Sequence, residues 1–234
     1  DSAVSNTTGT ITSSVSANVD AGFSIVSWTH GSGSQSIGHG LSQKPDMMIV
    51  KKRSGVSSFW TWHKGLSSET QSFIHVNTTN AAGANANAWN NQAPTASVFY
   101  QKEYILSNND TGIAYCFHSV DGYSKVGSFI GNGNVDGAFV HCGFKPAFLL
   151  FRRSTETGSW FMFDNARGTT YNVSGTNFDN VRDNKLNAEA NYAEDADSSW
   201  NIDFLSNGFK LRSPHVYMNG NNLTHIFIAF AESP

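Results

Sequence analysis

The sequence is poor in charge, and this limits the partners that we expect. Lys, Arg, Asp and Glu together make up 14% of the 234 residues, and the formal net charge is −3. Proteins that bind nucleic acid or an anionic membrane surface carry a concentrated basic patch, which so few charges do not provide. We therefore expect neither nucleic acid binding nor membrane insertion.

Long apolar runs and targeting signals are also missing. No stretch of about 18 apolar residues is present that would span a bilayer, and the first residues lack the charged and apolar regions of a signal peptide. The chain begins with Asp1 rather than Met. This start indicates processing, or excision of a C-terminal domain from a longer protein.

Cysteine is nearly absent. Cys116 and Cys142 lie within the apolar, strand-like runs 113–117 and 138–144. Because cysteine is among the residues most often buried, we predict two buried free thiols. A disulfide is the alternative, but a scaffold of this size does not depend on one.

The short motifs of common catalytic and metal sites are missing as well. There is no nucleophile elbow, His-Glu-x-x-His sequence, paired-cysteine zinc motif or phosphate loop. The carboxylates that a glycosidase pair would need are Asp164, Glu194, Asp195, Asp197 and Asp203. We interpret 194–197 as a solvated loop and Asp203 as a hydrogen-bonding residue at a turn. The sequence thus predicts no enzyme, no cofactor and no metal.

One segment allows a calcium alternative. Residues 132–137 read Asn-Gly-Asn-Val-Asp-Gly, with side-chain oxygens at alternating positions as in calcium-binding loops. The segment has no closing bidentate carboxylate. A glycine- and asparagine-rich hairpin is therefore the favoured interpretation.

What the sequence does contain is an approximate internal repeat. The matched segments, mostly apolar residues and turn glycines, are 22–26 with 122–126, 31–33 with 131–133, 44–52 with 145–153, 60–62 with 160–162, and 113–117 with 226–230. In this alignment Phe99 corresponds to Phe204, and Phe117 corresponds to Phe230. We expect these four phenylalanines, together with Trp60 and Trp160, to be core residues, because repeated apolar positions specify a scaffold.

Short apolar segments separated by glycine and asparagine turns, with 13% aromatic residues, predict an all-β fold. We expect an antiparallel β-sandwich, jelly-roll-like, built from two repeats over 21–120 and 121–234 that pack together. Whether they form one sandwich or two stays open. Residues 1–20 are interpreted as an extended arm or the end of a linker, with an edge strand as the alternative.

Several repeated segments also carry a family resemblance. The segments 122–133, 143–147, 203–212 and 229–234 resemble an uncharacterised domain of marine bacteriophage structural proteins, and the similarity covers the chain from about Gly22 to its end. The resemblance implies a place on the virion, near the C-terminal end of a tail fibre or another virion protein. Because the shared motifs belong to the scaffold, it transfers no catalytic residue.

Candidate ligand contacts come from the positions where the two repeats differ, since loops on a rigid framework commonly carry binding residues. An insertion over 78–95 contains Trp89, Asn90 and Asn91, and a longer loop over 167–197 contains Tyr171 and Tyr192. Aromatic rings cover the apolar faces of sugars, and amides match their hydroxyl groups. We expect Trp89 to be exposed; Trp200-Asn201 forms a similar pair.

The function expected from these observations is receptor recognition at the virion surface, by the distal domain of a tail fibre that binds a host-surface glycan. The alternative is a structural or decoration domain that packs against other virion subunits. A glycan-degrading enzyme is the least favoured possibility. A homotrimeric assembly is left open.

Overall fold

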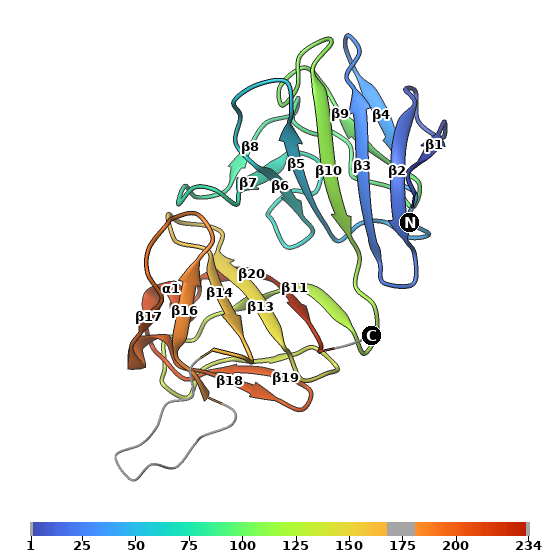
Figure 1. Cartoon of the computed structure of the whole chain (residues 1–234). Coiled ribbons are helices and arrows are strands. Elements are labelled where there is room, and N and C mark those ends of the chain that lie inside the picture. Colours follow the sequence, from blue (N-terminus) through green and yellow to red (C-terminus); the bar gives the residue numbers. More distant parts are fainter. Residues whose placement is uncertain (1, 168–180, 233–234) are drawn as a thin grey trace. The chain divides into compact units, whose positions relative to one another are not determined.

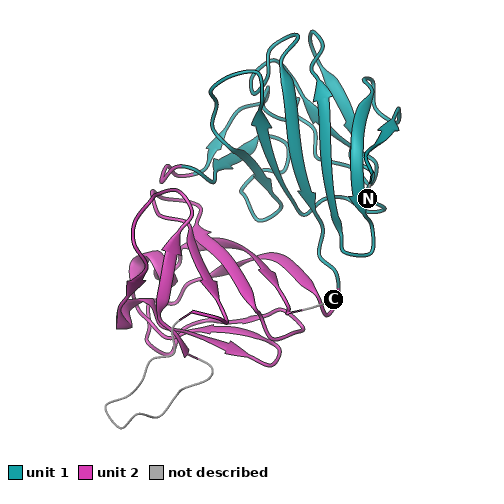
Figure 2. Ribbon diagram, in the orientation of Figure 1, with its two compact units in different colours: residues 1–77, 82–120 teal, residues 78–81, 121–234 magenta. Residues whose placement is uncertain are grey.

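The computed structural model describes residues 2–167 and 181–232, and almost all of its regular structure is antiparallel strand. The chain divides into two compact units (Figures 1 and 2). Unit 1 comprises Asp1–Asn77 and Ala82–Val120, and unit 2 comprises Thr78–Ala81 and Asp121–Pro234. The all-β, antiparallel prediction is confirmed. Among the described residues, no helix has the length and apolar character to span a membrane.

Unit 1 contains one large and one small antiparallel sheet. The large sheet has the order β1 (Val4–Asn6), β2 (Ser13–Asn18), β3 (Phe23–Thr29), β10 (Thr111–Phe117), β5 (Met47–Lys52), β6 (Trp60–His63), β7 (Ser72–His75) and β8 (Gly83–Ala84). The small sheet pairs β4 (Gln35–Gly38) with β9 (Val98–Gln101).

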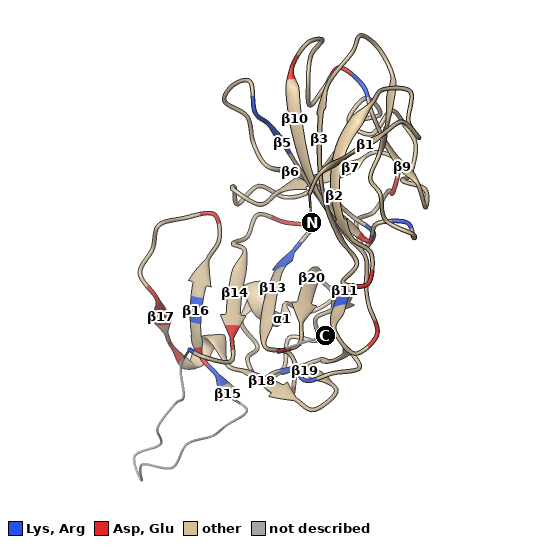
Figure 3. Cartoon of the chain, turned by 45° about the vertical axis from the view of Figure 1, so that its right-hand side comes forward, with Lys and Arg blue, Asp and Glu red and all other residues tan. Residues whose placement is uncertain are grey.

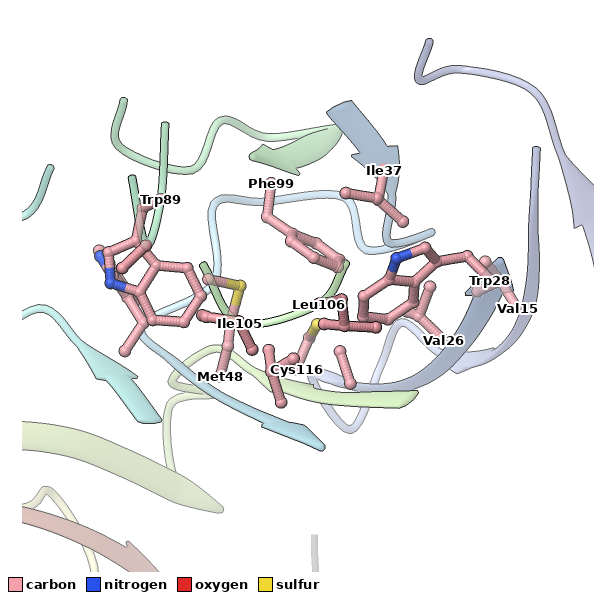
Figure 4. Close-up of a cluster of buried hydrophobic side chains, with 14 of the residues drawn as sticks. Val15, Val26, Trp28, Ile37, Met48, Trp89, Phe99, Ile105, Leu106 and Cys116 are labelled. Carbon is pink, nitrogen blue, oxygen red and sulfur yellow. The ribbon is translucent and has the colours of Figure 1, made fainter. Parts of the chain in front are cut away.

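The core of unit 1 lies between these two sheets. Ile37 and Phe99 come from the small sheet, and Val26 and Trp28 come from the large one. The rings of Trp28 and Phe99 meet edge to face with their centroids 5.4 Å apart. Figure 4 shows these side chains filling one continuous cluster.

The N-terminal segment corrects one expectation. Residues 4–18 are neither an extended arm nor a linker end, because β1 and β2 extend the large sheet and Val15 is buried in the core. The edge-strand alternative is the one observed. Serine and asparagine on the outward-facing positions hid the single apolar face of β2, which needs only Val15 and half-buried Ala17 to pack.

Unit 2 also has two sheets. The larger has the order β11 (Ser124–Ile130), β20 (Thr224–Phe230), β13 (Phe148–Arg153), β14 (Phe161–Asp164), β16 (Asn184–Asn187) and β17 (Asp195–Ala196), and the smaller has the order β12 (Phe139–His141), β19 (Gly208–Leu211), β18 (Ile202–Leu205) and β15 (Val181–Arg182). A 3-10 turn, η1 (Ser198–Trp200), and a short helix, α1 (Val216–Asn219), complete it. A second, phenylalanine-rich core lies between these sheets, so each unit is a sandwich with its own core.

Part of the predicted loop over 167–197 is strand. The structure places β15, β16 and β17 in its described part. The sequence concealed β16 because its buried positions are the polar residues Lys185 and Asn187. Lys185 is buried with an ion pair to Asp195 and a position over the ring of Phe161, which compensate its charge.

The two units share a strand order. In unit 1 it runs β3-β10-β5-β6, and in unit 2 it runs β11-β20-β13-β14. The small-sheet pairs also correspond, since Phe99 of β9 pairs with Ile37 and Phe209 of β19 pairs with Val140. By strand position, Phe99 therefore corresponds to Phe209. The sequence alignment had matched Phe99 with Phe204 instead. The internal repeat itself stays a prediction.

The terminal phenylalanines of the matched strands also differ from expectation. Phe117 and Phe230 are only half-buried and belong to neither core cluster. In β10 the core-facing positions are those of Ala114 and Cys116, so the next residue points to the opposite face of the sheet. The apolar spacing located the strands but did not show which face is covered. Trp160 is buried as expected, whereas Trp60 is half-buried against the core.

A fully buried arginine holds the segment Thr78–Ala81 in unit 2. The guanidinium of Arg152 donates hydrogen bonds to the carbonyl oxygens of Thr78 (3.0 Å), Thr79 (3.1 Å) and Asn80 (2.8 Å). Burial lowers the pKa of Arg152 to about 10, which leaves the group charged at neutral pH. Three carbonyl acceptors and the Trp160 ring beside the guanidinium stabilise this buried cation.

Candidate ligand-binding site

The main candidate site is a pocket of about 440 Å³ at the open end of the β18–β19 hairpin in unit 2. Its lining combines hydroxyl, amide, guanidinium and imidazole groups with two apolar side chains: Val135, Ser198, Ser199, Asn201, Arg212, Ser213, Pro214 and His215. We refer to it as the hairpin pocket.

The hairpin itself fixes the frame of this pocket. Asn201 directly precedes β18 and Arg212 directly follows β19, and the backbone N–H of Arg212 donates to the Asn201 carbonyl oxygen at 2.9 Å. The neighbouring pair, Ile202 opposite Leu211, is buried in the core. Two polar side chains are thereby held side by side at the edge of a rigid sheet.

The turn η1 forms the serine-rich wall. Asp197 caps it by accepting a hydrogen bond from the backbone N–H of Ser199 at 2.7 Å. The hydrogen bonds from Ser199 lower the pKa of the Asp197 carboxyl group below its usual range. The charged cap secures this turn, which places Ser198 and Ser199 in the pocket lining.

His215 forms the aromatic wall. Its ring lies 4.7 Å from the Trp200 ring, centroid to centroid, in an edge-to-face arrangement. The backbone N–H of Tyr217 donates to its Nδ1 at 3.3 Å, and its own backbone N–H donates to Ser213 Oγ at 3.1 Å. Desolvation lowers the pKa of His215, with Arg153 acting in the same direction. The lowered pKa favours the neutral imidazole, and a ring whose Nδ1 accepts this hydrogen bond holds its proton on Nε2.

Trp200, behind His215, is itself held in place. Its Nε1–H donates to Asp195 Oδ2 at 2.9 Å. Nζ of the buried Lys185 lies 4.6 Å from the centroid of the Trp200 ring and ion-pairs with the same carboxylate at 3.0 Å. These contacts restrict the ring before any ligand arrives, and a pre-ordered wall reduces the entropy lost on binding.

The pocket is amphipathic. Val135 and Pro214 are exposed apolar side chains, and His215 presents part of its ring. Around them stand the donors and acceptors of Asn201 and the serines. A pyranose ring has the same division, with apolar C–H faces and a rim of hydroxyl groups, so the pocket is chemically suited to a sugar.

The family assignment adds a name but no activity. A model described as "Domain of unknown function (DUF7483)" matches residues 1–234. The chain belongs to this family. Comparisons with curated proteins and with solved structures find no match. Membership of DUF7483 therefore assigns no ligand to the hairpin pocket, and its chemistry must be argued from the residues.

In this DUF7483 chain the structure overturns the expectation that Trp89 is exposed. Its side chain is 1% exposed and packs in the core of unit 1 with Met48 (Figure 4). The indole N–H donates to the Ser72 carbonyl oxygen at 2.8 Å. The sequence misled because Trp89 is followed by Asn90 and Asn91, whose positive φ angles of 52° and 53° form a turn that directs the ring inwards.

The side chains of Asn90 and Asn91 are engaged within unit 1. Asn90 Oδ1 accepts a hydrogen bond from Ser34 Oγ at 2.8 Å, and Asn91 Oδ1 accepts one from Gln71 Nε2 at 2.9 Å. Neither residue lines the hairpin pocket. Both contribute to a turn, and their role as ligand contacts stays a prediction.

The two tyrosine candidates have different outcomes. Tyr171 lies outside the described residues. Tyr192 lies between β16 and β17 with its side chain 69% exposed, and it is not part of the hairpin-pocket lining. An exposed ring is available for contact with a ligand, so Tyr192 stays a candidate.

The segment 132–137 forms a polar loop whose oxygens already accept hydrogen bonds. Asn132 Oδ1 accepts from Asn134 N and from Asn219 Nδ2, and Asn134 Oδ1 accepts from Asp136 N. These oxygens point to N–H donors, which does not favour calcium ligation. Among the described residues, no cluster of three His, Cys, Asp or Glu side chains is placed to hold a metal.

The sequence analysis missed most of the hairpin pocket. It noted Trp200-Asn201 but not Arg212, Ser213 or His215. A motif search would not find these residues, because the pocket is assembled from η1, the end of β19 and the loop that contains Val135. The available signal was the interruption after Leu211, where Ser213-Pro214 ends the strand pattern.

A second, smaller groove of about 380 Å³ is lined by residues in and beside β1, β2, β3 and β10 of unit 1. Its lining is mainly serine and threonine: Ser5, Thr12, Ser13, Ser14, Ser27, Trp28, Thr29, Arg53 and Thr111. The only aromatic residue among them, Trp28, is buried in the core. The groove therefore offers no exposed ring, and the hairpin pocket is the better sugar site.

Proposed function

We propose that this protein is a carbohydrate-binding module, and that the hairpin pocket binds a host-surface glycan. The observation that carries the proposal is the amphipathic lining of this pocket, in which the ring of His215, supported from behind by Trp200, stands beside Asn201 and a serine-rich turn. Sugar-binding sites need both features, because stacking covers the ring face while amides and hydroxyls match the rim.

The order of the lining supports binding without a large rearrangement. Asn201 and Arg212 are held by the hairpin, and Trp200 is held by Asp195 and Lys185. A site on rigid elements loses little conformational entropy when it closes on a ligand. This matters for weak ligands such as single sugar units.

Two of the carboxylates considered for a glycosidase pair are engaged in ways that favour binding over hydrolysis. Asp203 is buried and ion-paired with Arg212 at 2.5 Å, and Asp164 is ion-paired with Arg167 at 2.5 Å. A glycosidase needs two carboxyl groups that face each other across the bound sugar, and a carboxylate held in an ion pair is not free for that role. The proposal is therefore a binding protein and not an enzyme.

The placement on a virion rests on the sequence resemblance alone. Of the segments that carry it, 122–133 contains β11 and 203–212 contains most of the β18–β19 hairpin, which frames the pocket. A role as the distal, receptor-binding domain of a tail fibre joins this resemblance to the proposed glycan site. Charged residues are scattered over both units without a long basic stretch (Figure 3).

One observation favours the alternative of a structural domain that packs against other virion subunits. Val135, Val216 and Tyr217 are exposed apolar side chains in or beside the pocket, and exposed apolar groups also mark protein interfaces. In that case the same surface would bind a protein and would not respond to sugar.

A glycan array probed with the labelled full chain tests the proposal. Any glycan that binds is then titrated against Asn201→Ala, which removes the amide from the pocket, and against Tyr192→Ala, which removes the exposed ring outside it. Loss of binding with Asn201→Ala alone supports the hairpin pocket. Loss of glycan binding with Tyr192→Ala alone would place the binding site in the loop between β16 and β17. If no glycan binds, the carbohydrate proposal is wrong.

A further inference from the structure

Arg212 presents an unused edge of its guanidinium at the hairpin pocket. Its Nε donates to Asp203 Oδ2 at 2.5 Å. Among the described residues, neither Nη1 nor Nη2 donates a hydrogen bond to an acceptor, and the ion pair with Asp136 joins Nη1 to Oδ1 at 3.8 Å. The side chain is 42% exposed. The end-on edge, formed by the two Nη groups, is thus free to bind a ligand.

Asp203 fixes the orientation of this edge. It lies in β18, opposite Lys210 of β19, and its side chain is only 9% exposed. A carboxylate held in a strand and bonded to Nε prevents rotation of the guanidinium plane. Asp203 is therefore a positioning residue for Arg212.

Asp136 does not compete strongly for the same edge. Its side chain is 79% exposed, and its Oδ1 already accepts an ion pair from Lys210 Nζ at 2.9 Å. Ion pairs between exposed groups contribute little and are screened by solvent. A ligand that binds both Nη groups can displace the longer Asp136 contact at low cost.

Among the described residues that line the pocket, none carries a carboxylate, and Arg212 is the only one with a permanent charge. We propose that Arg212 binds the carboxylate of an acidic sugar, and that the glycan recognised by the hairpin pocket contains uronic acid units. This inference rests on the proposed carbohydrate function and specifies the substrate class within it.

The chemistry favours a carboxylate over a sugar hydroxyl at this position. The two Nη–H groups form a planar pair of donors, and a carboxylate accepts both in parallel, charge-assisted hydrogen bonds. A hydroxyl group offers one neutral acceptor and forms the weaker bond. The neutral His215, Asn201 and the serines are then left for the ring and its hydroxyl groups.

The test compares sugars that differ only in the carboxylate. Oligomers of galacturonate, glucuronate, mannuronate and guluronate are titrated calorimetrically into the full chain, each beside its carboxyl-reduced counterpart. We expect at least one uronate oligomer to bind, and its reduced form to bind at least about tenfold more weakly, the usual scale of a charge-assisted hydrogen bond. Added salt should weaken only the uronate.

Variants assign the effect to the guanidinium. Arg212→Gln should abolish the difference between a uronate and its reduced form, and Arg212→Lys should recover only part of it, because an ammonium group lacks the planar pair of donors. Arg53→Gln removes an exposed arginine from unit 1 and should change nothing. Thermal melts confirm that each variant is folded.

The outcomes separate the two proposals. If a uronate and its reduced form bind equally, or if Arg212→Gln leaves the difference unchanged, the acidic-sugar inference is wrong while a neutral-glycan pocket stands. If none of the four uronate oligomers binds but an array glycan does, the inference is again wrong. If nothing binds in either assay, the carbohydrate function itself fails.

Discussion

The indole N–H of Trp89 donates a hydrogen bond to the carbonyl oxygen of Ser72 at 2.8 Å, within the core of unit 1. The bond links a turn to the beginning of β7, and it gives a buried polar group the partner that burial requires. Trp89 is thus part of the scaffold, although the asparagines that follow it give the segment the composition of an exposed loop.

This relationship predicts a large loss of stability for Trp89→Ala. Truncation of a fully buried aromatic side chain should lower the free energy of unfolding by about 3–5 kcal/mol, measured by urea denaturation. Trp89→Phe keeps most of the packing and removes only the hydrogen bond, so its loss should be clearly smaller. A Trp89→Ala variant as stable as the wild type would show that the ring is exposed.

The phenylalanines of the two units give a second prediction. Phe99→Ala and Phe209→Ala should each cost about 3–5 kcal/mol, because both rings are fully buried between the sheets. Phe117→Ala and Phe230→Ala should cost less, since these rings are half-buried outside the cores. Equal losses in all four variants, measured by chemical denaturation, would contradict this order.

Stability should also depend on pH through His225. This side chain is buried, stacked on Phe129, and burial lowers its pKa to about 4. The unfolded chain, with an ordinary histidine pKa near 6.5, takes up the proton more readily. The contribution of His225 is therefore complete above about pH 6.5 and is lost as the pH falls towards 4, by up to roughly 3 kcal/mol.

The matched control is His225→Phe, which keeps a ring beside Phe129 and cannot titrate. The pKa values of the buried His30 and His39 are also lowered by desolvation. The wild type and His225→Phe both retain these two histidines. Thermal melts between pH 4 and 8 should therefore show a shallower decline for His225→Phe. The same decline in both proteins would argue against a buried neutral His225.

The two cysteines provide a simple check of both cores. Cys116 and Cys142 are buried and free, as the sequence predicted, and burial raises the pKa of each thiol to about 12. Neither should react with Ellman's reagent at pH 8 in the native protein, because both access and thiolate are lacking. Both should react after denaturation in guanidinium chloride. Rapid labelling of the folded chain would place a cysteine at the surface.

The sequence contained enough information to locate the strands, but not to identify which of their faces are buried. Short apolar segments located β3, β10, β13 and β20, because a strand in a sandwich must bury at least one of its faces. The pattern failed where polar residues are buried, as at Lys185, whose ion pair and ring contacts depend on the tertiary structure. It also could not show which face of β10 meets the core, a choice that depends on the second sheet.

The candidate site was less predictable for the same reason. Trp200-Asn201 was visible as a pair in the sequence. The role proposed for Arg212 depends on Asp203, which accepts a hydrogen bond from Nε and leaves the Nη edge free. This arrangement follows from the register of the β18–β19 hairpin. The spacing of residues along the chain does not show that Asp203 and Arg212 are in contact.

The measurement that tests the central claim most directly is an NMR titration of the tryptophan indole N–H signals with a bound oligosaccharide. The account predicts that the Trp200 signal shifts saturably, because its ring supports His215 at the hairpin pocket, while the Trp89 signal in the other core does not move. A Trp200 signal that is unchanged at saturating oligosaccharide would contradict the account.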